Sequence, residues 1–340
     1  MIFTDTLAHK NTNELPFWFM RQAGRYLPEY KKVRANFSNF LEFCYTPDAA
    51  AEVTLQPIDR FDMSAAIIFS DILVIPDALG ANVWFEEKKG PQLTPTLTQT
   101  ELDALSLSFM PDKLGKVYEA ISLTRHQLAK DKALIGFCGS PWTLACYMVE
   151  GKGSRDFASV RSLAFRDKVF FTSLIDLLTE AVILHAKEQI NAGVNAIQLF
   201  DSWSGVLSET EFEQWVIQPT AIIVSALKKQ FPLISVIGFP RMCGAKIIDF
   251  VEKTGVDAVN FDGSISLEFA KNNLQDKVIL QGNLDSILLA EDKDAVVMQA
   301  KKIIQTLGKK PFIFNLAHGI VPHTPIEHVQ ALCDVIKAAK

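Results

Sequence analysis

Short runs of consecutive apolar residues recur along the chain, and turn-forming residues bound most of them. Runs of this length without polar alternation are typical of strands that are buried on both faces of a sheet. The runs cover residues 17–20, 65–69, 133–137, 196–200, 234–239, 258–261, 278–282 and 312–316. Several of the segments between them have the spacing of amphipathic helices, so strands and helices alternate.

This alternation predicts a parallel sheet that helices cover. Because the strand is repeated eight times, we predict an α/β fold of the (β/α)8 or TIM-barrel class, built as a single domain from residues 1–340. A doubly wound open sheet is the alternative, but no G-x-G-x-x-G follows the first strand and no Walker loop is present. Residues 86–105 show no periodicity, and we interpret the region around 84–112 as a surface insertion.

Capping signals predict where two of the helices begin. In residues 46–61, Thr46 is a suitable N-cap and Pro47 suits the first helical position. In residues 324–339, Thr324 is the expected N-cap, Pro325 follows it, and Glu327 completes a capping box.

The composition is that of a globular enzyme, with 49% hydrophobic and 21% charged residues. No apolar run reaches the roughly 18 residues of a membrane span, and the N-terminus lacks the pattern of a secretory signal. We therefore expect a cytoplasmic protein without a membrane partner. The formal net charge of −5 argues against a nucleic-acid partner, whereas a local cluster of arginines would still bind an anionic small molecule.

The cysteines indicate neither disulfides nor a cysteine-only zinc site. There are five of them, they are widely scattered, and no CxxC pair occurs. Free buried thiols are the expected outcome.

Polar residues follow the predicted strands. Active sites of barrel enzymes lie at the carboxyl ends of the strands, so these residues should meet at one end of the fold. In chain order they are Arg21 and Arg25, Ser70 and Asp71, Tyr147, Asp201 and Ser202, Arg241 and Cys243, Asp262, Asn283, and His318.

Arg21 and Arg25 are four residues apart and would share a face of a helical turn. Guanidinium groups bind carboxylates bidentately, so the pair suits a substrate with several carboxylates. Gly24 permits close approach of a neighbouring group, and Arg34 adds a third cation. An arginine pair taken alone is more often structural, for instance in a salt bridge with Glu29.

Three further residues have open roles at this point. Asp71 ends an apolar strand, where burial would raise its pKa and an arginine would lower it, and it is equally suited to cap a helix. Tyr147 either donates to a carboxylate or fills core. His318 lies beside Gly319 at a strand end, which makes a site role and a structural role equally good interpretations.

These signals combine in the segments PFWFMRQAGRYLPEY, GFCGSPWTLACYMVEGKGS, QLFDSWSG, QGNLD and NLAHGIVPHTP, in this order. Together they resemble the uroporphyrinogen decarboxylase family from about residue 16 to the C-terminus. The resemblance implies a (β/α)8-barrel homodimer without metal or organic cofactor. It would convert uroporphyrinogen III to coproporphyrinogen III in haem and porphyrin synthesis.

The resemblance also implies roles for individual residues. Asp71 would hydrogen-bond the pyrrole N–H groups and stabilise the protonated ring that accepts the electrons released with carbon dioxide. The proton donor stays open between an arginine, Tyr147, His318 and a held water. The implied substrate-binding residues are Arg21, Gln22, Ala23, Gly24, Arg25, Arg34, Asp71, Tyr147, Ser202 and His318, with Asp71, Tyr147 and His318 as the catalytic candidates.

Two other functions fit the sequence less well. A zinc-dependent, corrinoid-linked methyltransferase of the same barrel superfamily would carry a His-x-Cys element after the fifth strand, but this chain reads Arg241-Met242-Cys243. A non-catalytic porphyrin carrier would need the arginines but not a carboxylate at Asp71.

Overall fold

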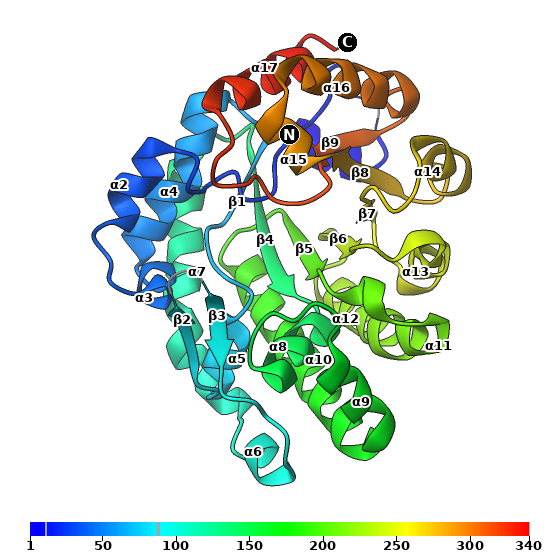
Figure 1. Ribbon diagram of the computed structural model, residues 1–340. Helices are drawn as coiled ribbons and strands as arrows, with labels where there is room; N and C mark the ends of the chain where they lie inside the picture. Colours follow the sequence, from blue (N-terminus) through cyan, green and yellow to red (C-terminus); the bar gives the residue numbers. More distant parts are fainter. Residues whose placement is uncertain (11, 87–88, 340) are drawn as a thin grey trace.

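The computed structural model describes residues 1–10, 12–86 and 89–339. Seven parallel strands form one sheet in the order β1-β4-β5-β6-β7-β8-β9. Figure 1 shows this sheet curled in the middle of the molecule with the helices around its outside. The strands are β1 (Ala65–Ile67), β4 (Ala133–Gly139), β5 (Ala196–Asp201), β6 (Ser235–Pro240), β7 (Ala258–Asn260), β8 (Ile279–Leu284) and β9 (Phe312–Leu316).

The prediction of a regular strand at residues 17–20 is wrong. Only Phe17 pairs with the sheet, in an isolated parallel bridge to Phe314 of β9. On its other side, the Ser64 amide donates to the Phe17 carbonyl at 3.0 Å, directly before β1. Phe17 therefore lies between the first and last strands of the sheet.

Side chains explain why this stretch is not a regular strand. The Phe19 amide donates to Gln22 Oε1 at 3.1 Å, and the Met20 amide donates to Asn315 Oδ1 at 3.2 Å. Because these donors are bound to side chains, they form no strand ladder with a neighbour. The other seven predicted runs are confirmed as strands, although their ends differ by a few residues.

The helices pack in pairs as well as on the sheet. Neighbouring pairs include α4 with α7, α10 with α12, and α16 with α17. The helices are α1 (Ile2–Leu7), α2 (Pro28–Arg34), α3 (Phe40–Cys44), α4 (Pro47–Phe61), α5 (Val74–Leu79), α6 (Gln99–Asp103), α7 (Met110–Gln127), α8 (Pro141–Glu150), α9 (Ala158–Arg166), α10 (Lys168–Asn191), α11 (Glu209–Phe212), α12 (Gln218–Gln230), α13 (Ile247–Thr254), α14 (Leu267–Asn273), α15 (Ser286–Glu291), α16 (Lys293–Leu307) and α17 (Ile326–Lys337).

Both helices with predicted caps exist, but only one starts as expected. Helix α4 begins at Pro47 after the N-cap residue Thr46, although the Thr46 hydroxyl donates to the Glu42 carbonyl at 2.8 Å and makes no capping bond. Helix α17 begins at Ile326 with Pro325 as its N-cap residue, so the predicted N-cap at Thr324 and its capping box are wrong. Pro325 has extended backbone angles (φ −66°, ψ 138°), which moves the helix start one residue beyond the position that a Thr324 cap requires.

The segment predicted as a surface insertion contains short elements of its own. Strands β2 (Val83–Glu86) and β3 (Gly90–Leu93) form an antiparallel hairpin separate from the main sheet. Helix α6 follows with a complete capping box between Thr98 and Glu101. Each element spans only a few residues, which explains the lack of periodicity in the sequence.

Helix α10 is the one helix of the described residues long and apolar enough to cross a membrane by length and composition alone. However, 56% of its most apolar stretch is buried inside the fold. It packs against α8, α12 and β4, so its apolar character is that of a core helix. All five cysteines are free and buried, as the sequence predicts.

A buried polar network crosses the interior of the curled sheet. The Gln281 amide nitrogen donates to Gln198 Oε1 at 3.2 Å and to Asn260 Oδ1 at 3.0 Å, and Trp18 Nε1 donates to Gln281 Oε1 at 2.9 Å. All four side chains are fully buried. Each bond therefore satisfies a polar atom that water does not reach.

We expect Gln281→Ala to lower the free energy of unfolding by about 3 kcal/mol, because it leaves buried Trp18 and Asn260 atoms without partners. Urea unfolding measures the change. Gln99→Ala is the control, because among the described residues the Gln99 side chain bonds only to Asp103, at the surface, and its loss should cost less than about 0.5 kcal/mol. Equal effects of the two substitutions would contradict the structural role of the network.

Candidate active site

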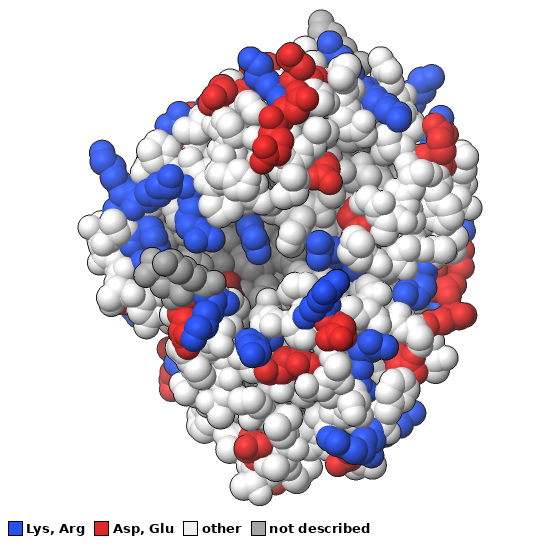
Figure 2. All heavy atoms as spheres, in the orientation of Figure 1, with Lys and Arg blue, Asp and Glu red and all other residues white. Residues whose placement is uncertain are grey.

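The carboxyl ends of the parallel strands share one rim, and several of the predicted site residues gather there. In Figure 2 a hollow lies over the central strands of Figure 1, with Lys and Arg side chains around its edge. Burial is the largest cause of the shifted pKa values of Asp71, Tyr147 and His318, and the charge of Arg21 acts on all three: it opposes the rise at Asp71 and Tyr147 and adds to the fall at His318. These four residues, which come from distant parts of the sequence, therefore lie near one another.

Arg21 occupies a strained backbone position beside the loop that follows β9. Its φ is 59°, in the left-handed region that side chains rarely adopt. The Ile320 amide donates to the Met20 carbonyl at 2.9 Å and ties this turn to the loop. A Cβ on Gly319 would overlap Cδ of Arg21, so the guanidinium stem lies across the glycine next to His318.

Within the turn, Gln22 faces the protein interior rather than the hollow. Its side chain is fully buried, accepting from the Phe19 amide at 3.1 Å and donating to the Ala65 carbonyl at 3.2 Å. Ala23 and Gly24 are partly buried, and a Cβ on Gly24 would lie 2.9 Å from the Arg21 carbonyl oxygen. These residues shape the turn that presents the arginines.

Burial raises the pKa of Tyr30 of α2 above its ordinary value. The charges of Arg34 and Arg25 partly oppose this rise, so both arginines lie near Tyr30. Arg25 is exposed. Arg34 is held by its own loop, donating to the Phe37 carbonyl at 2.5 Å. Glu29 does not pair with these arginines, because Arg60 holds it at 2.7 Å, and the structure describes no carboxylate within salt-bridge distance of Arg21, Arg25 or Arg34.

Asp71 combines both roles that the sequence left open. Its Oδ1 accepts from the Leu73 amide at 2.8 Å, as a turn-capping carboxylate does. Burial raises the pKa of Asp71 above its ordinary value, and the Leu73 bond and the Arg21 charge oppose this rise. Asp71 is also partly exposed. Because burial is the largest cause of its raised pKa, the Asp71 carboxyl is poorly hydrated, and a nearby positive charge would stabilise its ionised form.

Tyr147 reaches the same region from helix α8. Burial, and then the Asp71 charge, raise the pKa of Tyr147 to about 12. The phenol is thus protonated at neutral pH and can donate a hydrogen bond. Its ring packs edge-on against Trp203, with centroids 6.2 Å apart, and Ser202 precedes Trp203 in a partly buried position after β5.

His318 is an uncharged member of the site. Burial, and then the charges of Arg21 and Arg241, lower the pKa of His318 to about 3. Its Nδ1 is buried and has no hydrogen-bond partner among the described residues. A neutral imidazole offers one donor and one acceptor to a ligand, but it does not act as an imidazolium acid at neutral pH.

Sequence reasoning assigned no role to two residues of this site. Arg241 follows β6 directly and acts on His318 from the side of that strand. Trp203 packs on Tyr147, and its Nε1 is buried without a partner among the described residues. Their positions just after strands were the available signal, but neither had a charge pattern or spacing that distinguished it.

Unsatisfied polar atoms also mark this rim. Buried donors and acceptors without partners are rare in folded proteins and indicate a missing ligand or water. Among the described residues, such atoms after strand ends are Ser70 Oγ, Asp201 Oδ2, Trp203 Nε1 and His318 Nδ1.

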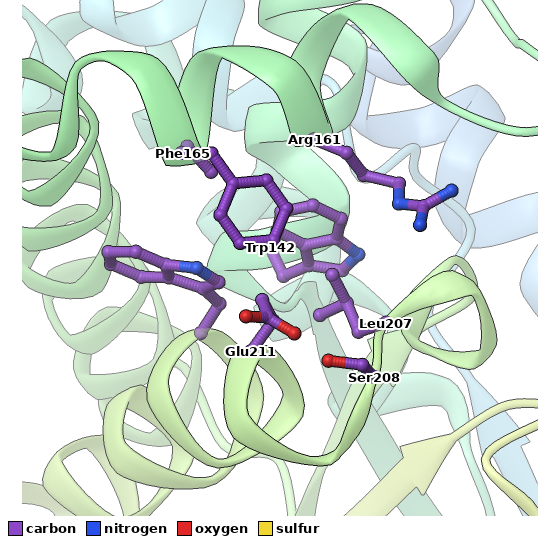
Figure 3. Close-up of a pocket in the computed structure, with 8 residues that line it drawn as sticks. Trp142, Arg161, Phe165, Leu207, Ser208 and Glu211 are labelled. Carbon is purple, nitrogen blue, oxygen red and sulfur yellow. The ribbon is translucent and has the colours of Figure 1, made fainter.

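A separate cavity lies between α8, α9 and α11. Figure 3 shows that aromatic residues, with Arg161 and Glu211, surround it. It lies behind Trp142, whose Nε1 donates to the Trp203 carbonyl at 3.0 Å. None of the predicted site residues lines it, so the rim remains the candidate site.

The described residues contain no group of three or more His, Cys, Asp or Glu side chains arranged to hold a metal ion. Cys243, the residue in question for a zinc site, is buried, and burial raises its thiol pKa. Its Sγ lies 3.7 Å from the Gly244 carbonyl.

The whole chain is similar to one enzyme family. The family model described as uroporphyrinogen decarboxylase (URO-D) matches residues 2–339. A uroporphyrinogen decarboxylase from Novosphingobium aromaticivorans is 45% identical over 332 residues, which cover 98% of this chain and 97% of that protein. One from Rhodospirillum rubrum is 44% identical over 338 residues, covering 99% of this chain and 97% of that protein.

Solved structures show a wider likeness in fold. A methyltransferase from Methanosarcina mazei superposes with a TM-score of 0.81 at 19% identity, covering 98% of this chain and 97% of that chain. A B12-independent methionine synthase from a Shewanella species superposes with a TM-score of 0.56 at 12% identity, covering 86% and 85%. At these identities the likeness concerns the fold alone.

We predict that the His318 imidazole does not titrate between about pH 5 and about pH 8, whereas an ordinary histidine has a midpoint near pH 6.5. Proton–nitrogen NMR of the imidazole measures this directly. Because the unfolded chain binds this proton below about pH 6.5 and the folded chain does not, His318 lowers the free energy of unfolding as the pH falls toward about 3. A His318 midpoint between about pH 6 and about pH 7 would contradict the assignment.

Proposed function

Because the chain belongs to the uroporphyrinogen decarboxylase family, we propose that it removes the carboxyl groups of the four acetate arms of uroporphyrinogen III and yields coproporphyrinogen III for haem and porphyrin synthesis. The observation that carries this proposal is 45% identity to a uroporphyrinogen decarboxylase over 98% of the chain. The rim fits the chemistry, because Arg21, which has no carboxylate partner among the described residues, acts on one poorly hydrated carboxyl, Asp71.

Substrate binding uses the arginines. The substrate carries a carboxylate on each acetate and propionate arm, and guanidinium groups bind such groups through paired charged hydrogen bonds. Arg21 and Arg25 are without carboxylate partners among the described residues, so binding displaces water rather than an existing ion pair. Tyr147, Ser202 and neutral His318 add hydrogen bonds around the ring, and Arg34 lies further from the centre.

Decarboxylation needs an acceptor for the electrons of the breaking bond. Protonation of the ring carbon between the pyrrole nitrogen and the carbon that bears the acetate arm makes the ring cationic, with positive charge shared by the acetate-bearing carbon. The bond to the carboxylate then breaks, carbon dioxide leaves, and the electron pair neutralises the ring. A proton adds to the former acetate carbon, the proton gained by the ring is lost, and a methyl group remains.

Asp71 stabilises the cationic ring. As a carboxylate it accepts hydrogen bonds from the pyrrole N–H groups, and its charge lies close to the positive charge that develops. Burial alone favours the neutral acid, so the positive ring and Arg21 together favour the ionised form. The group is thus arranged to bind the intermediate more strongly than the neutral substrate.

The choice of proton donor is narrower than the sequence alone allowed. His318 is neutral above about pH 3, and the phenol of Tyr147 has a pKa of about 12. Both are better suited to hydrogen bonding than to donating a proton at neutral pH. A water held by an arginine and relaying a proton from the solvent is the remaining candidate, because the guanidinium group itself does not give up a proton in proteins.

The wider architecture follows from the same proposal. Phe17 closes the sheet as an eighth, one-residue strand, which is supported by its bridge to Phe314 and its bond to Ser64. The chain acts as a single barrel domain and as a cytoplasmic homodimer without metal or organic cofactor. Family membership supports these properties.

Anaerobic incubation with uroporphyrinogen III, followed by chromatography of the oxidised products, tests the activity. We expect stepwise loss of four carboxyl groups, with the tetracarboxylic product accumulating. Unchanged octacarboxylic substrate would contradict the proposed function. A metal assay on the purified protein separates the alternative, since a zinc-dependent methyltransferase would contain stoichiometric zinc.

We predict that Asp71→Asn lowers kcat by about 10³-fold, because it removes the charge that stabilises the cationic ring. Binding of coproporphyrinogen should change by less than about tenfold, since the arginines remain. Anaerobic initial rates and equilibrium binding measure the two effects.

The matched control is Asp131→Asn, an exposed aspartate before β4 at the opposite end of the strands. It should leave both quantities unchanged. Turnover that survives in Asp71→Asn would refute the role of this carboxyl.

A further inference from the structure

Asp201 is a buried carboxyl that the mechanism above does not use. It is the last residue of β5 and only 2% exposed. Its Oδ1 lies 2.6 Å from Thr143 Oγ1, while Oδ2 is buried without a partner among the described residues. Burying a carboxylate with one oxygen that has no hydrogen-bond partner costs free energy of folding. We therefore expect this side chain to have a role at the rim.

The side chain joins two segments that carry site residues. Thr143 lies in α8, one turn before Tyr147. The Thr143 hydroxyl accepts from the Trp203 amide at 3.2 Å and also bonds to Asp201. One hydroxyl therefore connects the helix of Tyr147, the loop of Trp203 and the end of β5.

The backbone of Asp201 adds a third segment. Its carbonyl accepts from Ser204 Oγ at 3.0 Å and from the Arg241 amide at 3.1 Å. Ser204 Oγ is also 3.0 Å from the Arg241 carbonyl. These bonds also fix the start of the loop after β6, which carries Arg241 toward His318. We call this meeting point of Thr143, Asp201, Ser204 and the Trp203 amide the junction.

We propose that Asp201 is a positioning residue for the decarboxylation site, and that its hydrogen bond to Thr143 holds Tyr147 and Trp203 where they meet the substrate. This inference rests on the proposed function. It goes further, because it assigns a role to a residue that does not touch the substrate. A shift of about 1 Å in such groups is enough to slow an enzyme by about 10²-fold.

The protonation state of Asp201 gives the proposal a distinct signature. Burial raises the pKa of Asp201 to about 7, and the Thr143 bond opposes the rise. The titratable groups that face it are the thiols of Cys146 on α8 and Cys243 after β6, and the charge of Asp201 raises the pKa of each. No cationic side chain forms a salt bridge with Asp201 among the described residues.

Ionisation of Asp201 strengthens its bond to Thr143 but places a charge with one unsatisfied oxygen inside the fold, which strains the junction. Below about pH 7 the neutral group bonds to Thr143 at little cost. Above about pH 7 the group ionises with one bare oxygen, and the segments carrying Tyr147 and Trp203 shift. The wild-type kcat should therefore fall on the alkaline side with a midpoint of about pH 7.

Asp201→Asn and Asp201→Leu test this inference as a pair. The asparagine amide keeps an oxygen for Thr143 but does not ionise, so we expect kcat within about twofold of wild type at about pH 6 and no alkaline fall. Leucine removes the bond at similar volume, so kcat should fall about tenfold or more with KM nearly unchanged. An asparagine variant with the wild-type alkaline fall, or a leucine variant with full kcat, would overturn the proposal.

Thr143→Ser and Thr143→Val provide a second pair that leaves Asp201 in place. Serine keeps the hydroxyl and should retain kcat, whereas valine removes it and should reproduce the leucine variant. Full activity of the valine variant would contradict the proposal. Thermal unfolding of each variant identifies any that fails to fold.

The Trp203 indole N–H resonance reports on the junction without any turnover. In the wild type it should shift with a midpoint of about pH 7, and in Asp201→Asn it should not. A resonance insensitive to pH in the wild type would overturn the positioning role. Absence of decarboxylation together with the expected shift would instead refute the proposed function and leave the junction supported.

Discussion

The parallel alignment of the strands is the constraint on which the rest of the structure depends. In a parallel sheet every strand delivers its carboxyl end to the same rim. Residues as distant in sequence as Arg21 and His318 therefore become neighbours, and Asp71 and Tyr147 join them from β1 and α8. The isolated bridge between Phe17 and Phe314 sets the position of the Arg21 turn in this arrangement.

Desolvation then fixes the protonation states at the rim. It keeps His318 neutral and Tyr147 protonated. At Asp71 burial favours the neutral acid, whereas the charge of Arg21 favours the carboxylate. In the mechanism proposed above, a positively charged intermediate resolves this in favour of the ionised form. The site is thus adapted to charge that appears during the reaction, although the chain as a whole carries a formal net charge of −5.

The sequence revealed the strands and the rim because both have simple physical signatures. Continuous apolar runs marked the buried strands, and polar residues directly after them marked the site. The stretch at residues 17–20 was misread because its amides bond to the side chains of Gln22 and Asn315, which hydrophobicity does not report. Likewise, Thr324 looked like a cap until the extended angles of Pro325 placed it outside the helix.

The candidate site residues also differ in whether a local sequence pattern reveals them. Arg21, Asp71 and His318 were predicted from their positions after apolar runs and from the family resemblance, and the structure brings them near one another, whereas the buried side chain of Gln22 serves the turn itself. Trp203 and the Asp201–Thr143 bond depend on contacts between α8 and β5 that no local pattern encodes.

The most direct test of the central claim is a crystal structure of the protein with coproporphyrinogen, grown and frozen without oxygen. The account predicts a macrocycle in the rim hollow, with its pyrrole N–H groups within hydrogen-bonding distance of Asp71 and its carboxylates bound by Arg21 and Arg25. A macrocycle bound elsewhere, or one whose pyrrole nitrogens face away from Asp71, would contradict it.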